Sequence, residues 1–226
     1  GSIVSPSTRC SVTGLRPTFG RVSKYGAMAL SWSMDKLGPI CRSANDCAIV
    51  LDFIRGADEL DISTISAGFS LPKLASLKGL KIAYLKDLFD DDYSFSSNDQ
   101  QALEIFREMG AYLQAISLPD DLPVGALRII LNAEAAAAFD DLTRSDRDSL
   151  LVSQSNWSWP NSFRTSRFIP AVEYIQANRI RSVLIRQVHD LFKEFDVIIT
   201  PSYGGIQLTL TNLSGHPALL LPTGFT

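Results

Sequence analysis

Apolar positions along the chain follow helical spacing in some segments and continuous runs in others. Helical spacing predicts helices over residues 44–55, 97–109 and 171–192. Continuous apolar runs at 80–85, 111–116 and 196–199 predict buried strands, the last being typical of a central parallel strand. Strand, helix and strand in this order predict a right-handed parallel crossover. The pattern therefore favours an α/β fold with a mixed, largely parallel sheet flanked by helices.

Polar and small residues mark where these elements begin and end. Ser43 with Asp46, and Ser97 with Gln100, have the spacing of helix caps. Pro123 suits the first turn of a further helix that runs to residue 139 through an alanine run, where another element can pack closely. On the last long helix, three arginines are expected to face solvent: Arg179, Arg181 and Arg186.

The remaining segments are irregular. Residues 1–38 are rich in Gly, Ser and Pro and predict loops and short strands, and residues 58–72 predict a polar connection. The chain has no internal repeat and no low-complexity tract. We therefore expect one α/β domain over residues 1–226.

Composition narrows the class of protein. Of 226 residues, 46% are hydrophobic and 20% are charged, which is typical of a folded domain. The net charge of -3, with lysines and arginines scattered, gives no basic surface for nucleic acid or an anionic membrane. No apolar run is long enough for a membrane helix. A cytoplasmic protein is expected, although a targeting segment upstream of these residues would change that.

Cysteine and histidine spacing argues against a metal or cofactor. Cys10, Cys41 and Cys47 lack zinc-ligand spacing and are expected to be reduced, buried thiols. His189 and His216 lie far apart and suit structural positions. The sequence therefore predicts no metal site, no cofactor and no histidine-based catalytic triad.

Four short blocks occur in a characteristic order. They are Gly1-Ser2-Ile3-Val4-Ser5-Pro6 with Cys10 and residues 14–23, then residues 33–39 with Arg42 and Asp46, then residues 195–201, and lastly residues 212–218. In this order and spacing the blocks resemble the amidase signature family. The resemblance spans the chain and implies an amidase-signature fold that is incomplete at both ends.

The resemblance implies a serine nucleophile. Ser2 matches the serine that attacks an amide carbonyl in the family, where a second serine in a cis peptide and a neutral lysine relay its proton. Gly1 and Ser2 match the turn whose backbone N–H groups form the oxyanion hole. The family's lysine and cis serine precede the nucleophile, so no lysine of this chain is assigned catalysis.

Two departures and one alternative bear on this match. Val4 stands where the family usually has arginine, and Ser11 where it usually has glycine. A Gly-Ser pair at a chain start is also a common remnant of tag removal, so Gly1-Ser2 has a second reading as cloning sequence.

Polar residues after the last predicted strand are candidates for substrate binding. Thr200, Ser202 and Tyr203 follow that strand and could line a pocket, or could simply form a turn. Asn212, Ser214 and His216 are more consistent with fixing a loop. Trp157 and Trp159 could wall a cleft or cover the core.

Two classes of function follow. The first is hydrolysis of a small carboxamide through a serine acyl-enzyme, with the glutaminase subunit of a tRNA-dependent amidotransferase as a subtype. The family's glutamine-binding aspartate would fall near Gly205, which has no side chain, so a generic amidase is preferred. The second is an inert fragment or interaction domain, for which exposed apolar surface and a homodimer are expected.

Overall fold

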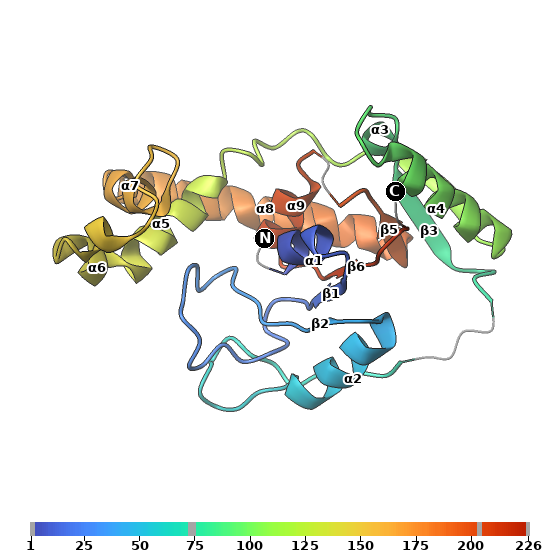
Figure 1. Cartoon of the computed structure of the whole chain (residues 1–226), viewed down its shortest axis with the longest axis horizontal. Coiled ribbons are helices and arrows are strands. Elements are labelled where there is room, and N and C mark those ends of the chain that lie inside the picture. The colour runs from blue at the N-terminus through green and yellow to red at the C-terminus, as the bar shows by residue number, and fades with distance from the viewer. Residues whose placement is uncertain (1–2, 72–75, 203–204, 225–226) are drawn as a thin grey trace.

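A computed structural model describes residues 3–71, 76–202 and 205–224, and it confirms an α/β fold with helices packed around sheets (Figure 1). The strands are β1 Thr13–Arg16, β2 Ile40–Cys41, β3 Lys81–Leu85, β4 Tyr112–Ile116, β5 Val197–Ile199 and β6 Ala218–Leu220. The helices are α1 Val4–Arg9, α2 Ala44–Ile54, α3 Lys86–Phe89, α4 Ser96–Glu108, α5 Arg128–Ala138, α6 Asp140–Arg144, the 3-10 helix Arg147–Leu150, α7 Trp159–Ser166, α8 Ala171–Glu194 and α9 Gln207–Ser214. That residues 1–226 form one domain stays a prediction.

The parallel sheet has the strand order β4-β3-β5. β3 pairs in parallel with β4 after the crossover through α4, as the sequence predicted, and with β5 on its other side. Asp196 fixes the start of β5, because its N–H donates to Lys81 O at 2.8 Å while its carboxylate accepts from Lys81 N at 2.8 Å. β5 was expected to be central, but in the described sheet β3 holds that place.

A second, antiparallel sheet has the order β2-β1-β6 and carries α1 on one face. The expectation of loops and strands alone before residue 38 is wrong, because six residues after Ile3 form α1. Gly14 of β1 permits this packing: a Cβ there would lie 2.1 Å from Ser7 Oγ. The start of the chain is thereby held against β1.

Of the two helix caps predicted from the sequence, the structure confirms one and contradicts the other. The Ser43 hydroxyl accepts a hydrogen bond from Asp46 N at 3.1 Å, which confirms the predicted cap of α2. α4 instead begins at Ser96 without a side-chain cap, and Gln100 donates to Phe89 O at 2.8 Å. The glutamine therefore fastens the end of α3 to α4 and does not close a capping box.

α5 begins at Arg128, five residues later than predicted. Residues 123–127 form turns, with Ala126 N bonded to Pro123 O at 2.9 Å, and Gly125 in this stretch disfavours helix. The alanine run packs against α7, as its small side chains allow.

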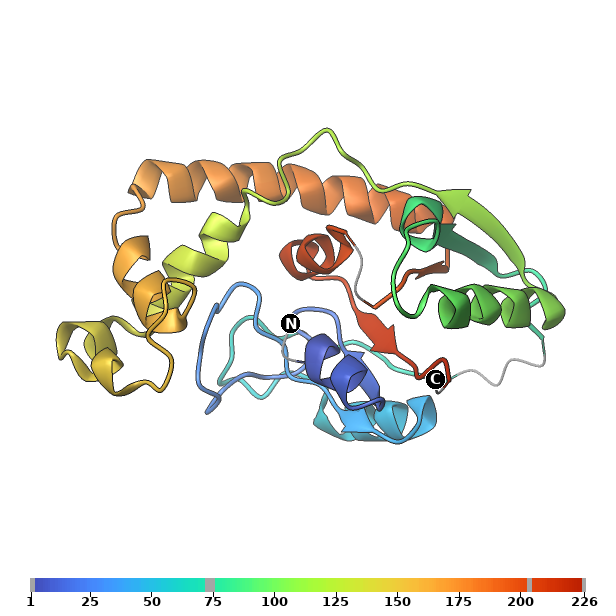
Figure 2. The same ribbon diagram turned by 45° about the horizontal axis from the view of Figure 1, so that its top comes forward.

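α8 spans the molecule and joins its two ends (Figures 1 and 2). Its start lies by α5 and α7, and its end leads into β5. The main core lies between α5, α8 and α9, where Ile130, Leu184, Val188, Leu210 and Leu213 are buried. Within the described ranges, no helix is both long and apolar enough to cross a membrane.

Candidate functional site

Three of the predicted site residues, Gly1, Ser2 and Tyr203, lie outside the described residues. The structure does describe the surroundings into which they lead. The Ile3 side chain lies beside Gly14 and Gly38, since a Cβ on these glycines would lie 3.4 Å and 3.2 Å from it. Helix α1 begins at the next residue. The predicted nucleophile thus precedes a helix that packs on β1 and β6.

Thr200 and Ser202 lie at the carboxyl end of β5, where the sequence placed them. Both are half-buried, and the proline between them is buried. Gln207, at the start of α9, is buried and donates its amide to Pro201 O at 3.3 Å and Ser202 O at 3.5 Å. The first turn of α9 therefore holds the loop that carries these candidates.

The other end of α9 is capped by three cations. Arg181 Nε donates to Leu213 O at 2.6 Å, Lys36 Nζ to Asn212 O at 3.4 Å, and Arg16 to Thr211 Oγ1 at 2.8 Å. Positive charge is favourable at a helix C-terminus, where carbonyl groups lack helical partners. Cations drawn from β1, the following loop and α8 thus fix α9.

Burial lowers the pKa values of these three cations, and repulsion by its neighbours lowers that of Lys36 further. Burial, with the neighbouring Arg16 and Arg181 charges, lowers the pKa of Lys36 to about 7. Burial also lowers the pKa of Arg16 to about 10 and that of Arg181. The solvent-facing prediction for Arg181 is wrong, because the capping contacts draw its guanidinium inward to 9% exposure.

A buried carboxylate is hydrogen-bonded to the loop that carries Lys36. Glu134 of α5 is 1% exposed and accepts hydrogen bonds from the Ser31 hydroxyl, Ser33 N at 3.3 Å and Tyr174 OH at 2.9 Å. Burial and this bond to Glu134 raise the pKa of Tyr174. Glu134 thereby ties the loop to α5 and α8.

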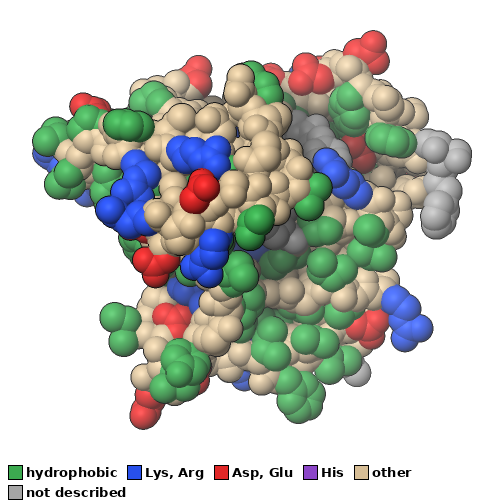
Figure 3. All heavy atoms as spheres, turned by 60° about the vertical axis from the view of Figure 1, so that its left-hand side comes forward, with side chains coloured by type: hydrophobic (Ala, Val, Ile, Leu, Met, Phe, Trp, Pro, Cys, Tyr) green, Lys and Arg blue, Asp and Glu red, His purple; other side chains and the backbone are tan. Residues whose placement is uncertain are grey.

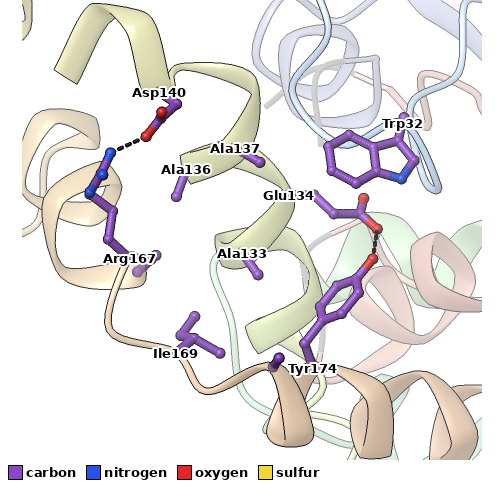
Figure 4. Close-up of a pocket in the computed structure, with 11 residues that line it drawn as sticks. Trp32, Ala133, Glu134, Ala136, Ala137, Asp140, Arg167, Ile169 and Tyr174 are labelled. Carbon is purple, nitrogen blue, oxygen red and sulfur yellow. Dashed lines mark hydrogen bonds and ion pairs between the residues drawn. The ribbon is translucent and has the colours of Figure 1, made fainter. Parts of the chain in front are cut away.

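Glu134 and Tyr174 border a cavity of about 520 Å³ (Figure 4). The wall consists mainly of small or apolar side chains from α5, α7 and the start of α8, with the Trp32 indole opposite. Asp140 and Arg167 form an ion pair at the opposite end from Tyr174 in Figure 4. The described residues that line this cavity are Trp32, Ala133, Glu134, Ala136, Ala137, Asp140, Ser166, Arg167, Ile169, Ala171 and Tyr174.

A second cavity of about 440 Å³ is also lined by Trp32. Lys24, Asp61, Asp35 and Lys36 contribute to it. Lys24 is paired with Asp61 at 3.5 Å and lies over the Phe19 ring at 4.2 Å. In the described part of the chain, neither Thr200 nor Ser202 lines either cavity.

The sequence did not single out Glu134, Trp32 or Tyr174. A charged residue inside the alanine run of a predicted helix was the available indication for Glu134, since such a position faces the packed side. Trp157, which was considered as a cleft residue, is 94% exposed, and Trp159 stacks on Phe163 at 5.5 Å. The tryptophan at the cavity is a different one.

Histidine and cysteine positions were predicted in part. His216 stacks on Phe192 at 4.8 Å and its Nδ1 bonds with Ser214 Oγ at 2.9 Å, the structural role expected of it. Cys47 is buried, whereas Cys10 is exposed at the end of α1, so burial of all three thiols is wrong. In the described residues, no three His, Cys, Asp or Glu side chains gather as metal ligands.

Comparison with known proteins decides the family. The family model described as "Amidase" matches residues 1–219. The chain belongs to the amidase family. The match includes Gly1 and Ser2 and runs through β5 and α9, so it contains all four sequence blocks noted above.

Curated relatives of this amidase-family chain include subunits of glutamyl-tRNA(Gln) amidotransferases. Those of Roseiflexus castenholzii and Bacillus pumilus are 31% and 30% identical to it over 273 and 271 residues, covering the whole chain. The chain spans about half the length of these relatives, 55% and 56%.

Solved structures support the fold. A glutamyl-tRNA(Gln) amidotransferase subunit from Thermotoga maritima has a TM-score of 0.80 at 24% identity, covering all of this chain and 54% of that one. An amidase family protein from Bacillus anthracis has a TM-score of 0.78 at 22% identity, covering all of this chain and 49% of that one.

Proposed function

We propose that this chain contributes the nucleophile and a substrate cavity to an enzyme that hydrolyses a carboxamide to a carboxylate and ammonia. The observation that carries the proposal is the amidase family match from residue 1 to residue 219, which includes Ser2. In the proposed reaction the Ser2 oxygen attacks the amide carbonyl carbon. As the C–N bond breaks, the leaving nitrogen takes up the proton that the Ser2 hydroxyl gave to its acceptor. Ammonia leaves, and water then releases the acid from the acyl-enzyme.

The proton acceptor is proposed to come from polypeptide upstream of Ser2, as in the family. Two lysines near the cavities are engaged elsewhere: Lys24 pairs with Asp61, and Lys36 donates to two backbone carbonyl groups, Met34 O at 2.9 Å and Asn212 O. This engagement supports assigning them structural roles. Gly1 and Ser2 are proposed to stabilise the oxyanion with their N–H groups.

We propose that the cavity bordered by Glu134 and Trp32 holds the substrate beside the nucleophile, with Thr200, Ser202 and Tyr203 lining the approach. Thr200 and Ser202 do not line this cavity, but they lie at the carboxyl end of a parallel strand, where functional loops of α/β proteins gather, which supports their part in the approach. The mainly apolar wall, with a few polar groups at its edges, is typical of a small-molecule site.

The electrostatics of the cavity favour a generic amidase over a glutaminase. A glutamine carboxylate would need a free cation. Among the described lining residues Arg167 alone is basic, and it is paired with Asp140, which also pairs with Arg144. Glu134 is the other charged residue of this lining. The curated relatives named above belong to amidotransferases, so glutamine is the substrate against which this proposal is tested.

An ammonia-release assay of the full-length protein tests the proposal. Neutral amides and glutamine are compared at equal concentrations, with Ser2→Ala as the variant. We expect turnover of a neutral amide, and a loss of at least about a thousandfold in rate on removing the nucleophile. Glutamine turnover above that of every neutral amide, or full activity of Ser2→Ala, would contradict it.

A second candidate function is an interaction domain, and the outer face of α2 favours it. Ile49 and Phe53 on α2 are 50% and 86% exposed, although Cys47 and Leu51 of the same helix are buried. Hydrophobic side chains also cover much of the lower half of the face in Figure 3, where the segment before residue 71 lies. Sedimentation of Phe53→Ser against the parent tests this: a dimer that dissociates in the variant, without ammonia release in either, would support it.

A further inference from the structure

The segment Ser31-Trp32-Ser33 is fixed on both sides of its central residue. The Ser31 hydroxyl and Ser33 N donate to Glu134, and Arg181 donates to Ser33 Oγ at 2.7 Å and Ser33 O at 2.8 Å. The Trp32 carbonyl accepts from Lys24 Nζ at 3.4 Å. A buried carboxylate and a buried guanidinium thus hold the backbone of a single tryptophan.

The Trp32 indole, in contrast, is not packed into the core. It is 50% exposed, and it is the one residue common to the described linings of the two cavities. Figure 4 shows the ring beside Glu134, across from the alanines of α5. A large apolar ring that is half exposed, lines two cavities and stands on a fixed backbone is suited to contacting a ligand.

The opposite wall of the larger cavity leaves room for a flat group. Ala133, Ala136 and Ala137 present only methyl groups, and Ile169 adds an apolar surface. The polar groups lie at the ends, with Glu134 and Tyr174 at one and the Asp140–Arg167 pair at the other. Such a cavity offers one aromatic face and an apolar floor, with its charged groups at the two ends.

We infer that Trp32 determines specificity by stacking on a planar aromatic ring of the substrate, so that the preferred substrates are aromatic carboxamides without a carboxylate. The inference rests on the proposed function, because it identifies the substrate class of that same cavity. The same ring also lines the second cavity. Aromatic stacking adds to apolar burial, whereas a carboxylate would meet Glu134.

Calorimetric binding to the full-length protein tests this inference, with Ser2→Ala as the background so that no ligand is consumed. Benzamide and cyclohexanecarboxamide have nearly the same size, but only benzamide has a planar aromatic face. We expect benzamide to bind about fivefold more tightly, and 4-carbamoylbenzoate about tenfold more weakly than benzamide.

Substitutions of Trp32 test whether the preference for benzamide arises at this side chain. Trp32→Ala and Trp32→Leu should weaken benzamide binding about tenfold and cyclohexanecarboxamide binding much less, while Trp32→Phe should stay within about threefold of the parent. Trp157→Ala is the matched control, since that indole is 94% exposed and lines neither cavity, and it should change nothing. If the smaller side chains disturb folding, the comparison of benzamide with cyclohexanecarboxamide in the Ser2→Ala protein still tests the stacking.

The inference is overturned if benzamide shows no preference over the saturated amide, or if the Trp32 variants weaken both ligands equally or neither. Failure of the proposed function is a separate result. A protein that binds benzamide through Trp32 but releases no ammonia from any amide would contradict hydrolysis and leave the stacking assignment intact.

Discussion

Arg181 on α8 and Ser33 in the loop before β2, 148 residues apart in sequence, are joined by two hydrogen bonds from one guanidinium. The third contact of that guanidinium, from Nε to Leu213 O, reaches the last turn of α9. One buried side chain therefore connects α8, the loop that presents Trp32, and the helix that holds the Thr200–Ser202 loop. The geometry of both candidate substrate regions depends on it.

Replacing Arg181 should destabilise the protein strongly. In Arg181→Lys a single ammonium cannot reproduce three directed donors, and buried acceptors lose their partners, so we expect a loss of about 2–4 kcal/mol in the free energy of unfolding. Arg179→Lys on the exposed side of the same helix is the control and should stay within about 0.5 kcal/mol. Urea denaturation measures both. Equal, small effects would show that the Arg181 contacts carry little stability.

Removing the Glu134 carboxylate should have a comparable effect. Glu134→Ala leaves the Ser31 hydroxyl, Ser33 N and Tyr174 OH without their acceptor, which should lower the free energy of unfolding by about 2–4 kcal/mol. Glu173→Ala, an exposed carboxylate on α8, should change it by less than about 0.5 kcal/mol. Chemical denaturation of the two variants side by side is the measurement. A Glu134→Ala protein as stable as the parent would contradict the clamp around Trp32.

Lys36 should make stability depend on pH. Its pKa is lowered to about 7 in the folded chain, so between pH 7 and about 10.5 the unfolded state binds more protons and stability rises with pH. Below pH 7 the lysine is charged in both states, and the cost of burying that charge is fully present. Lys36→Met should therefore raise the unfolding free energy most near pH 6 and progressively less toward pH 10.

Unfolding of this variant and the parent at pH 6, 8 and 10 measures the difference. Lys78→Met, at an exposed position, is the matched control and should show a constant, small difference across this range. A difference between Lys36→Met and the parent that grows with pH would have the wrong sign for a buried, destabilised ammonium group.

Thiol reactivity should separate Cys10 from Cys47. Cys10 is exposed, whereas Cys47 is fully buried and burial raises its pKa to about 11. Because the thiolate is the reactive form, an aromatic disulfide reagent should modify Cys10 in the native protein and Cys47 only after unfolding. Cys10→Ser should abolish the fast phase. Rapid labelling of Cys47 in the native chain would contradict the packing of α2 on β1.

Periodic elements were the most predictable part of the fold. α2, α4 and α8, with β3 and β4, follow from apolar spacing, because their packing faces repeat over several turns or strand residues. α1 is six residues long and is held by Gly14 and its neighbours, so its own sequence contains too little pattern. The start of α5 was misplaced because Pro123 favours a helical first turn while the stretch with Gly125 does not continue it.

The candidate site residues also differ in whether the sequence alone could indicate them. Ser2 is proposed from the sequence because its neighbours match a family block, and Thr200 and Ser202 because they follow a strand ended by proline; their roles stay predictions. Trp32, Glu134 and Arg181 were not predictable, because the bonds that join Glu134 and Arg181 to Ser31 and Ser33 span 101 to 148 residues in sequence. A single sequence shows that Glu134 is charged within an apolar run, but only the structure shows which hydroxyl groups satisfy it.

The central claim, that Ser2 becomes acylated, is tested most directly by treating the full-length protein with a fluorophosphonate and mapping the modified peptide by mass spectrometry. We expect one adduct, on Ser2, with loss of ammonia release in proportion to labelling and no adduct in Ser2→Ala. An adduct on another residue, or an unlabelled protein that still hydrolyses amides, would contradict the account.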